Sequence, residues 1–227
     1  MKARTRASVV LQVPGGNILI DTGPELRLQM VREKLPVAHA LLYTHYHADH
    51  LYGLDDVRLF PKILNGPLPV YCAAEVEAVI RQSFGYIFER EAQLLPPGVL
   101  PKLEFRRIAA EPFRALGERI TPIPLIHGRF DVFGFRIGDL AYCTDANAIP
   151  DSSWPLLAGL DTLILDCLRP GPEHPSHFGL AGALAAIERI GPKRAFLTHL
   201  SHLFDWGDPP AMPAHVRLAY DGLRIEF

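Results

Sequence analysis

The sequence has few cysteines and no long apolar run. Its 227 residues include three cysteines, Cys72, Cys143 and Cys167, which are widely spaced and form no CxxC pair. This pattern is typical of small buried side chains rather than of a metal-binding or redox motif. No apolar run approaches the roughly 18 residues that a membrane-spanning helix needs, and the basic N-terminus lacks the apolar stretch of a signal peptide. We therefore expect a cytoplasmic protein with no membrane partner.

The sequence also lacks an excess of charge of either sign. The formal net charge is −2 at pH 7, so no broad basic surface is available and we do not expect a nucleic-acid partner. Apolar residues make up 48% and charged residues 21%, the balance of a globular protein with a full hydrophobic core. No repeat, low-complexity tract or linker interrupts the chain. We therefore expect a single domain over 1–227.

Apolar and β-branched stretches predict many short strands. The first two, over 8–13 and 17–21, flank the turn residues Pro14-Gly15-Gly16 and should form a hairpin. A third strand, over 38–43, ends directly at a cluster of histidines. Further strands are expected over 69–72, 102–108, 119–125, 133–137, 140–145, 162–167 and 194–199, with two short closing strands within 215–227.

Apolar residues at helical spacing predict helices between these strands. One is expected over 25–33 and another from about residue 73. A third, with Ser176 as its N-cap, should end at Gly191. Hairpins come first, and strands later alternate with helices. This order predicts an α/β sandwich with sheets inside, helices outside and a site at the strand ends.

The histidine cluster predicts a metal site. His45, His47 and His50 lie within six residues, with Asp49 between them, directly after an apolar strand. In a loop at a strand end, such side chains can converge on one cavity, and imidazole plus carboxylate suits Zn, Mn or Fe. The alternative is a solvated histidine-rich turn. Three histidines and an aspartate behind a buried strand favour the metal site.

Three later strands also end on a metal-ligand type of residue. They are the strands before His127, Asp145 and His199. Taken alone, each residue is better explained as a capped or hydrogen-bonded polar group at a strand end. Together with the first cluster, they support one another as ligands, and Asp145 offers a carboxylate that can bridge two metals.

The pattern HxHxDH, followed by a distant His, an Asp and a final His, resembles the metallo-β-lactamase fold superfamily. Leu19-Ile20-Asp21-Thr22-Gly23 resembles its first motif. Within the superfamily, the segment from Leu197 to His202 and the position of His177 are most similar to the phosphodiesterase branch. That branch includes the cyclic-phosphate phosphodiesterases of phosphonate breakdown and, more distantly, the tRNA 3′-processing endonucleases. The resemblance implies a four-layer αββα sandwich.

The resemblance also implies a role for each matching residue. Asp21 would orient the ligand loop without binding a metal. His177 matches the position that supplies a general acid, although a surface histidine in a proline-rich loop is the plainer alternative. His177 and Asp49 are the expected catalytic residues. One metal would be held by His45, His47 and His127 and the other by Asp49, His50 and His199, with Asp145 bridging them.

The chemistry implied by this resemblance is hydrolysis with two divalent metals. Zn or Mn is expected, and the same ligands accept Fe or Ni. A hydroxide shared by the metals would attack phosphorus or a carbonyl carbon, and His177 would protonate the leaving alkoxide. We expect a phosphodiesterase for a small phosphorylated substrate. The alternatives are a lactonase or other carboxylic ester hydrolase, and a metal-binding accessory protein with little catalysis.

Two residues are weaker candidates for substrate contacts. Arg58 follows the metal loop in Gly53-Leu54-Asp55-Asp56-Val57-Arg58 and could meet an anionic substrate, although pairing with a neighbouring aspartate is favoured. His202 lies just beyond the last expected ligand.

The chain departs from the phosphodiesterase branch at its start. Relatives often begin with one more strand and a cysteine-rich loop that holds a structural zinc. This chain starts at what corresponds to the second strand and has no N-terminal cysteine. We therefore expect one edge strand to be missing and no structural zinc. The exposed hairpin edge would favour strand pairing between two copies in a homodimer.

Overall fold

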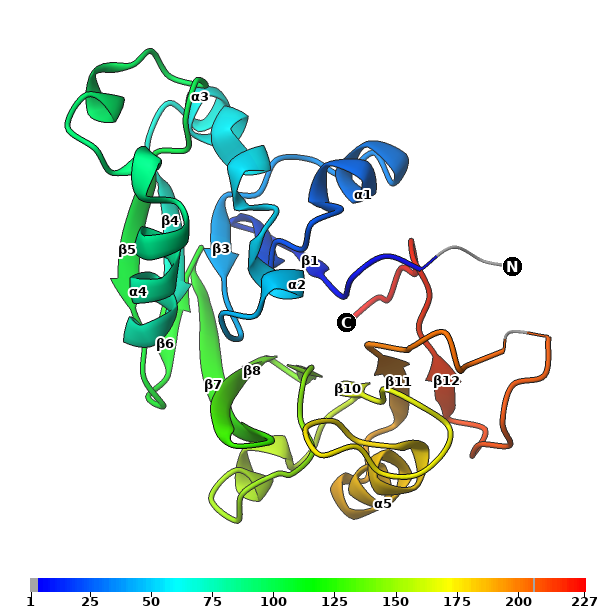
Figure 1. Ribbon diagram of the computed structural model, residues 1–227. Helices are drawn as coiled ribbons and strands as arrows, with labels where there is room; N and C mark the ends of the chain where they lie inside the picture. The colour runs from blue at the N-terminus through cyan, green and yellow to red at the C-terminus, as the bar shows by residue number, and fades with distance from the viewer. Residues whose placement is uncertain (1–3, 206) are drawn as a thin grey trace. The chain divides into compact units, whose positions relative to one another are not determined.

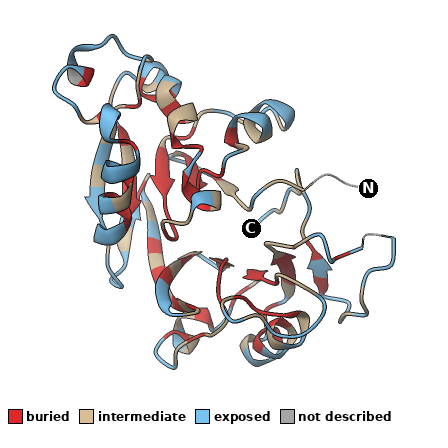
Figure 2. Ribbon diagram, in the orientation of Figure 1, coloured by how far each residue is buried: buried red, intermediate tan, exposed pale blue. Residues whose placement is uncertain are grey.

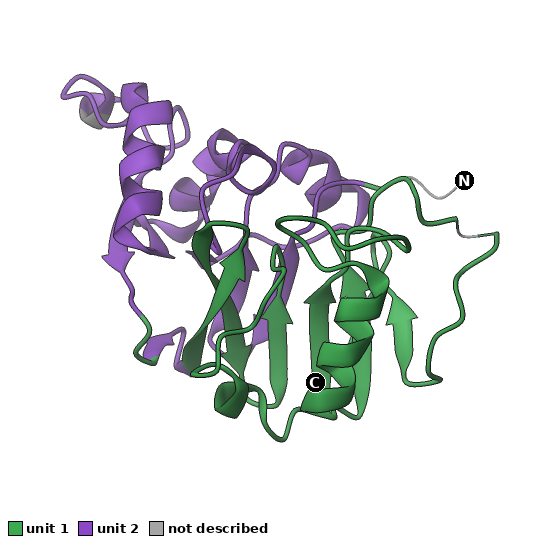
Figure 3. Cartoon of the chain, turned by 60° about the horizontal axis from the view of Figure 1, so that its bottom comes forward, with its two compact units in different colours: residues 1–4, 110–112, 119–227 green, residues 5–109, 113–118 purple. Residues whose placement is uncertain are grey.

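The computed structural model describes residues 4–205 and 207–227, and the chain divides into two compact units. Unit 1 comprises residues 1–4, 110–112 and 119–227, and unit 2 comprises residues 5–109 and 113–118 (Figure 3). Both units combine strands with helices around apolar interiors. In each, the strand ends carry the polar residues singled out in the sequence.

Unit 2 contains a five-stranded sheet in the order β1-β2-β3-β4-β5 (Figure 1). The first two strands form the expected antiparallel hairpin, and all later neighbours run parallel. The strands are β1 (Val9–Val13), β2 (Gly16–Ile20), β3 (Ala40–Leu42), β4 (Leu68–Cys72) and β5 (Leu103–Arg107), with β6 (Phe113–Ala115) further along the unit. The helices are α1 (Leu26–Arg32), α2 (Ala48–Leu51), η1 (Leu54–Leu59), α3 (Phe60–Leu64), α4 (Ala74–Ser83), η2 (Gly85–Ile87) and η3 (Ala92–Leu94).

The parallel pairing of β2 and β3 places two motifs at one edge of the sheet. Both strands are almost entirely buried (Figure 2), as expected for continuous apolar runs in a parallel sheet. Because parallel strands end at the same edge, Asp21 after β2 and the histidine loop after β3 emerge side by side. The backbone N–H of Asp21 donates to Leu42 O across this edge, at 2.9 Å.

Unit 1 contains strands in the order β12-β11-β10-β9-β8-β7. β9 to β12 run parallel, and β8 is antiparallel to both β9 and β7, so β7 and β9 point the same way. Five strands, β7 and β9 to β12, therefore have their C-terminal ends at one edge of the sheet. The strands of this unit are β7 (Glu118–His127), β8 (Phe130–Ile137), β9 (Leu140–Cys143), β10 (Thr162–Asp166), β11 (Arg194–Thr198) and β12 (Val216–Leu218). Its helices are η4 (Trp154–Leu157) and α5 (Leu180–Ile190).

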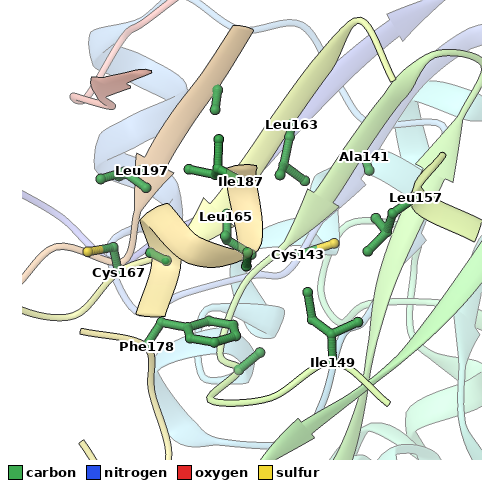
Figure 4. Packing of buried hydrophobic residues seen from close by; sticks show 14 of the residues in the cluster. Ala141, Cys143, Ile149, Leu157, Leu163, Leu165, Cys167, Phe178, Ile187 and Leu197 are labelled. Carbon is green, nitrogen blue, oxygen red and sulfur yellow. The ribbon is translucent and has the colours of Figure 1, made fainter. Parts of the chain in front are cut away.

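Helix α5 covers one face of the unit 1 sheet. Its Ala183, Ala186 and Ile187 belong to the same buried cluster as Leu163 and Leu165 of β10 (Figure 4). The small side chains allow the helix to lie close to the sheet, and Gly191 ends it in a left-handed conformation with φ 65°. The packing fixes the positions from which the strand-end residues emerge.

The predicted fold class is confirmed as a mixed α/β fold with two sheets. The three cysteines are free and buried, as expected. The predicted helices over 25–33 and from about residue 73 correspond to α1 and α4. Within the described residues, no helix combines the length and apolar character that a membrane crossing requires. The single domain over 1–227 stays a prediction.

The predicted N-cap at Ser176 is wrong. Helix α5 begins at Leu180, and Gly179 is its N-cap. The residues before it make tertiary hydrogen bonds instead: Ser176 O accepts from His127 Nδ1 at 2.6 Å, and the N–H of Phe178 donates to Ala146 O at 2.7 Å. These bonds hold the backbone out of the helix.

Several strands are shorter than predicted. β9 and β11 end at Cys143 and Thr198, and the residues that leave them, Asp145 and His199, have left-handed φ values of 52° and 57°. The prediction of a second closing strand within 215–227 is also wrong. In the described part of this segment β12 is the one strand, and a turn over 220–223 follows it.

Close backbone contact at Gly53 yields a stability prediction. A Cβ at this position would lie 2.1 Å from Gly23 O, on the segment that follows Asp21. Gly53→Ala should therefore force the two segments apart and lower the free energy of unfolding by about 2–3 kcal/mol. Urea unfolding of the purified protein measures this loss.

Gly66→Ala is the matched control for this prediction. Among the described residues, no heavy atom lies within 4 Å of a Cβ built at Gly66. Its free energy of unfolding should stay within about 0.5 kcal/mol of the unmodified protein. Equal unfolding midpoints for the two variants would contradict the packing argument.

Candidate metal centre

The HxHxDH loop brings its four polar side chains together within unit 2. His47 is the N-cap of α2, with extended backbone, so Asp49 and His50 lie on the first turn of a short helix. The ring of His45 lies 4.6 Å from that of His47 and 4.4 Å from that of His50, centroid to centroid. His50 Nε2 lies 3.5 Å from Asp49 Oδ2. Strand, loop and helix start thus gather the predicted ligands of this motif.

Asp21 fixes this loop through hydrogen bonds to its backbone and side chains. Its carboxylate is fully buried and accepts the backbone N–H of Thr44 at 2.9 Å, the Thr44 hydroxyl at 2.8 Å and His50 Nδ1 at 2.8 Å. Burial raises the pKa of Asp21, and the bonds from His50 and Thr44 oppose this rise. Its backbone is left-handed, with φ 63°, a strained conformation typical of functional positions.

These hydrogen bonds select the tautomers of two histidines. His50 donates its Nδ1 hydrogen to Asp21, so the lone pair of its ring lies on Nε2. The Thr44 hydroxyl donates to Asp21 and can therefore accept from His45 Nδ1, 2.9 Å away. Both rings then present Nε2 as a metal-binding nitrogen, oriented through the opposite side of the ring. This donor set fits a divalent metal ion.

Unit 1 gathers the other predicted ligands around Asp145. Its Oδ2 lies 3.9 Å from His127 Nε2, and its Oδ1 lies 3.5 Å from His199 Nε2. The carboxylate therefore turns one oxygen toward each histidine, the arrangement that a bridging ligand needs. His127 Nδ1 donates to Ser176 O, which again selects the tautomer with the lone pair on Nε2.

Asp166 is an acidic residue beside this cluster for which the sequence alone predicts no role. It is completely buried at the end of β10, and its Oδ1 lies 3.2 Å from His177 Nδ1 and 3.5 Å from His199 Nδ1. Its Oδ2 accepts the N–H of Phe178 at 3.0 Å. Burial raises the pKa of Asp166, and the two histidines oppose the rise. The signal for it in the sequence is an apolar strand ending on an acid.

His177 lies inside this cluster rather than on the surface. It is 9% exposed, stacks on the ring of His199 at 4.8 Å and meets that of His127 edge-on at 4.6 Å. The plain alternative of a surface histidine in a proline-rich loop is therefore excluded. One ligand-type atom from each of Asp145, Asp166, His177 and His199 lies within 4.8 Å of the others.

The two weaker candidates do not join these clusters. Arg58 Nη1 pairs with Asp55 Oδ2 at 3.0 Å, as the sequence favoured, and Tyr86 donates to the same carboxylate at 2.7 Å. His202 is exposed in the loop after His199. For both residues, a contact with substrate stays a prediction.

A family match establishes which superfamily the chain belongs to. Residues 16–200 match the family described as the beta-lactamase superfamily domain. The chain belongs to this superfamily. Its members are metal-dependent hydrolases, which agrees with the histidine and aspartate clusters found at the strand ends of each unit.

Individual relatives narrow the comparison. This β-lactamase superfamily chain is 39% identical to a crystal structure described as a new diphosphatase from the PhnP family, with a TM-score of 0.88, covering 99% of this chain and 84% of that one. It is 20% identical to the short form of human tRNase Z, with a TM-score of 0.75, covering 97% of this chain and 92% of that one, which shows a shared fold.

A curated relative is much longer than this chain. An octanoyltransferase of Porphyromonas gingivalis is 33% identical over 97% of this chain. The chain spans only 44% of that protein's length.

Asp21 yields a prediction about metal binding. Asp21→Asn replaces an acceptor of three hydrogen bonds by an amide that can no longer receive them all, so His50 and the Thr44 backbone lose their orientation. Zinc affinity of the purified apoprotein should fall about 10–100-fold. Competition with a chromogenic chelator measures this affinity.

Asp151→Asn is the control for this measurement. Asp151 is an exposed aspartate in a turn of unit 1, and its substitution should leave zinc affinity unchanged. If Asp21→Asn also binds zinc as tightly as the unmodified protein, Asp21 does not orient the ligands.

Proposed function

We propose that this domain is a dinuclear metal-dependent phosphodiesterase that hydrolyses a small phosphorylated substrate. The observation that carries the proposal is the buried His177, whose Nδ1 faces Asp166 and whose ring lies against His127 and His199. A group held in this way beside metal-ligand residues suits proton delivery to a leaving oxygen. The 39% identical PhnP-family diphosphatase supports a phosphate substrate.

The proposal includes the metal ligands that the motifs imply. It is supported by the oriented histidines of unit 2 and by the two-sided carboxylate of Asp145 in unit 1. When bound, two divalent ions lower the pKa of water and neutralise charge on phosphate oxygens. Zn or Mn is the proposed metal, with Fe or Ni as alternatives. His45, His47 and His127 would hold one ion and Asp49, His50 and His199 the other, and Asp145 would be a ligand to both.

His177 would act as the general acid. With Nδ1 facing Asp166, its second proton sits on Nε2 and can pass to the leaving alkoxide as the P–O bond breaks. The buried carboxylate of Asp166 stabilises the imidazolium before transfer and fixes the ring plane, as the aspartate does in other His–Asp pairs. The leaving group departs as a neutral alcohol, and the ring then takes up a new proton from solvent.

A carboxylic ester hydrolase is the second candidate. One observation favours it: the 33% identical relative is an octanoyltransferase, an enzyme that transfers an eight-carbon acyl group. The same kind of metal-activated hydroxide can also attack a carbonyl carbon. Lactones and octanoyl esters therefore belong among the substrates tested. Cytoplasmic location and homodimer formation remain predictions.

A substrate and metal screen tests the proposal. Bis(p-nitrophenyl) phosphate, a diphosphate diester, p-nitrophenyl phosphate, a lactone, a thioester and p-nitrophenyl octanoate are each assayed with Zn, Mn, Fe or Ni. The diester or the diphosphate diester should give the highest kcat/KM. A preference for octanoate or lactone would move the assignment to the second candidate. No turnover at all, with two metals bound per chain, would indicate the accessory protein.

His177→Ala tests the proton donor. For a diester with an alkyl leaving group, kcat should fall by about 10²–10⁴-fold. For bis(p-nitrophenyl) phosphate the loss should be smaller, because p-nitrophenolate departs without needing a proton. Both rates are measured at equal metal content, determined by elemental analysis.

His215→Ala is the control for this variant. His215 is exposed, outside the strand-end cluster of unit 1, and its removal should leave both rates unchanged. An equal loss for both leaving groups in His177→Ala, or no loss, would rule out the acid role.

A further inference from the structure

The loop over 169–179 is closed at its base and precedes α5 in unit 1. The N–H of Leu168 donates to Phe178 O at 2.9 Å, and the N–H of Leu180 donates to Arg169 O at 3.0 Å. Arg169 and Gly179 form an isolated parallel bridge. These contacts join the two ends of the loop, so the residues between them form a closed loop.

Side chains hold the interior of this 169–179 loop. Arg169 donates from Nε to Pro172 O and from Nη2 to Glu173 O, both at 2.6 Å. The Glu173 carboxylate accepts the N–H groups of Gly179 and Gly182, at 2.8 and 2.9 Å. Because the Arg169 hydrogen-bond acceptors are neutral carbonyls, these bonds fix the loop without neutralising the guanidinium charge.

His174 is the group that this loop adds next to the proposed acid. Its ring centroid lies 5.3 Å from that of His177, and the residue is partly exposed. Its Nδ1 accepts the backbone N–H of Ser176 at 3.3 Å and lies 3.2 Å from the Ser176 hydroxyl. An Nδ1 that accepts a hydrogen bond carries no proton, so the hydrogen of the neutral ring is on Nε2.

The surroundings keep His174 neutral. Burial lowers its pKa, and the charges of His177 and Arg169 lower it further. Near pH 7 the ring is therefore a fixed N–H donor with a guanidinium nearby. A donor and a cation together favour an anionic ligand over a neutral one.

We propose that His174 binds a phosphate oxygen of the substrate through Nε2–H, with the Arg169 charge in support, and so selects phosphate substrates over carboxylic esters. This inference rests on the proposed function, because it places the reacting phosphate beside His177. A phosphodiester carries charge on its oxygens that a donor can bind. An ester carbonyl gains much less from the same contact.

His174→Ala tests the proposal. The KM for bis(p-nitrophenyl) phosphate should rise about tenfold, the effect of one hydrogen bond to a charged group, while kcat stays within about twofold. The KM for p-nitrophenyl octanoate should not change. His174→Gln, which keeps an N–H donor near the position of Nε2, should restore most of the phosphodiester affinity. His215→Ala serves as the matched histidine control.

A binding measurement judges His174 independently of turnover. Titration of the zinc-loaded protein with inorganic phosphate should show about tenfold weaker binding for His174→Ala than for the unmodified protein. Unchanged phosphate affinity would overturn the proposal, as would an equal rise in KM for the octanoate. If the unmodified protein hydrolyses no phosphodiester, the proposed function fails. The phosphate titration still decides whether His174 binds the anion.

Discussion

Two buried carboxylates face imidazole rings at Nδ1: Asp21 in unit 2 faces one ring, that of His50, and Asp166 in unit 1 faces two. Removing an ionised carboxylate from water costs several kcal/mol, and only well-placed donors offset that cost. Asp21 receives three such donors, and Asp166 receives the N–H of Phe178 and faces two histidines. The consequence is chemical as well as structural. A ring fixed through Nδ1 has one nitrogen, Nε2, for a metal or for a proton in transit.

Backbone strain at the strand ends serves the same purpose. Asp21, Asp145 and His199 all follow strands directly or within two residues and all have positive φ, although none is glycine. Each such residue costs on the order of 1–3 kcal/mol. The conformation turns the chain sharply at the end of its strand, so the side chain stays at the sheet edge. Backbone strain and carboxylate burial both lower the stability of the fold, and the packing of the apolar sheets must offset this loss.

The sequence predicts the parts of this arrangement that depend on local pattern. Apolar runs predict most strands, and a residue of ligand type after a run identifies His127, Asp145 and His199, because parallel strands deliver their ends to one edge. It fails where tertiary contacts override local preference. Ser176 is a residue type favoured at helix N-caps, yet its carbonyl accepts a hydrogen bond from a histidine 49 residues earlier in the chain. Asp166 shows the strand-then-acid pattern, but only the fold shows that it faces two rings.

Ser176 connects the 169–179 loop to the strand ends of unit 1. Its carbonyl orients His127, its backbone N–H orients His174, and His177 follows it directly. One short stretch of the 169–179 loop thus positions a proposed ligand, a proposed acid and a proposed phosphate donor. The strand ends are constrained by burial and strain and allow little variation. The outer part of the loop is bound mainly by its own side chains, Arg169 and Glu173. Changes there can alter which substrate is bound without disturbing the carboxylates beneath, so substrate specificity in this chain is expected to reside in the loop rather than in the sheets.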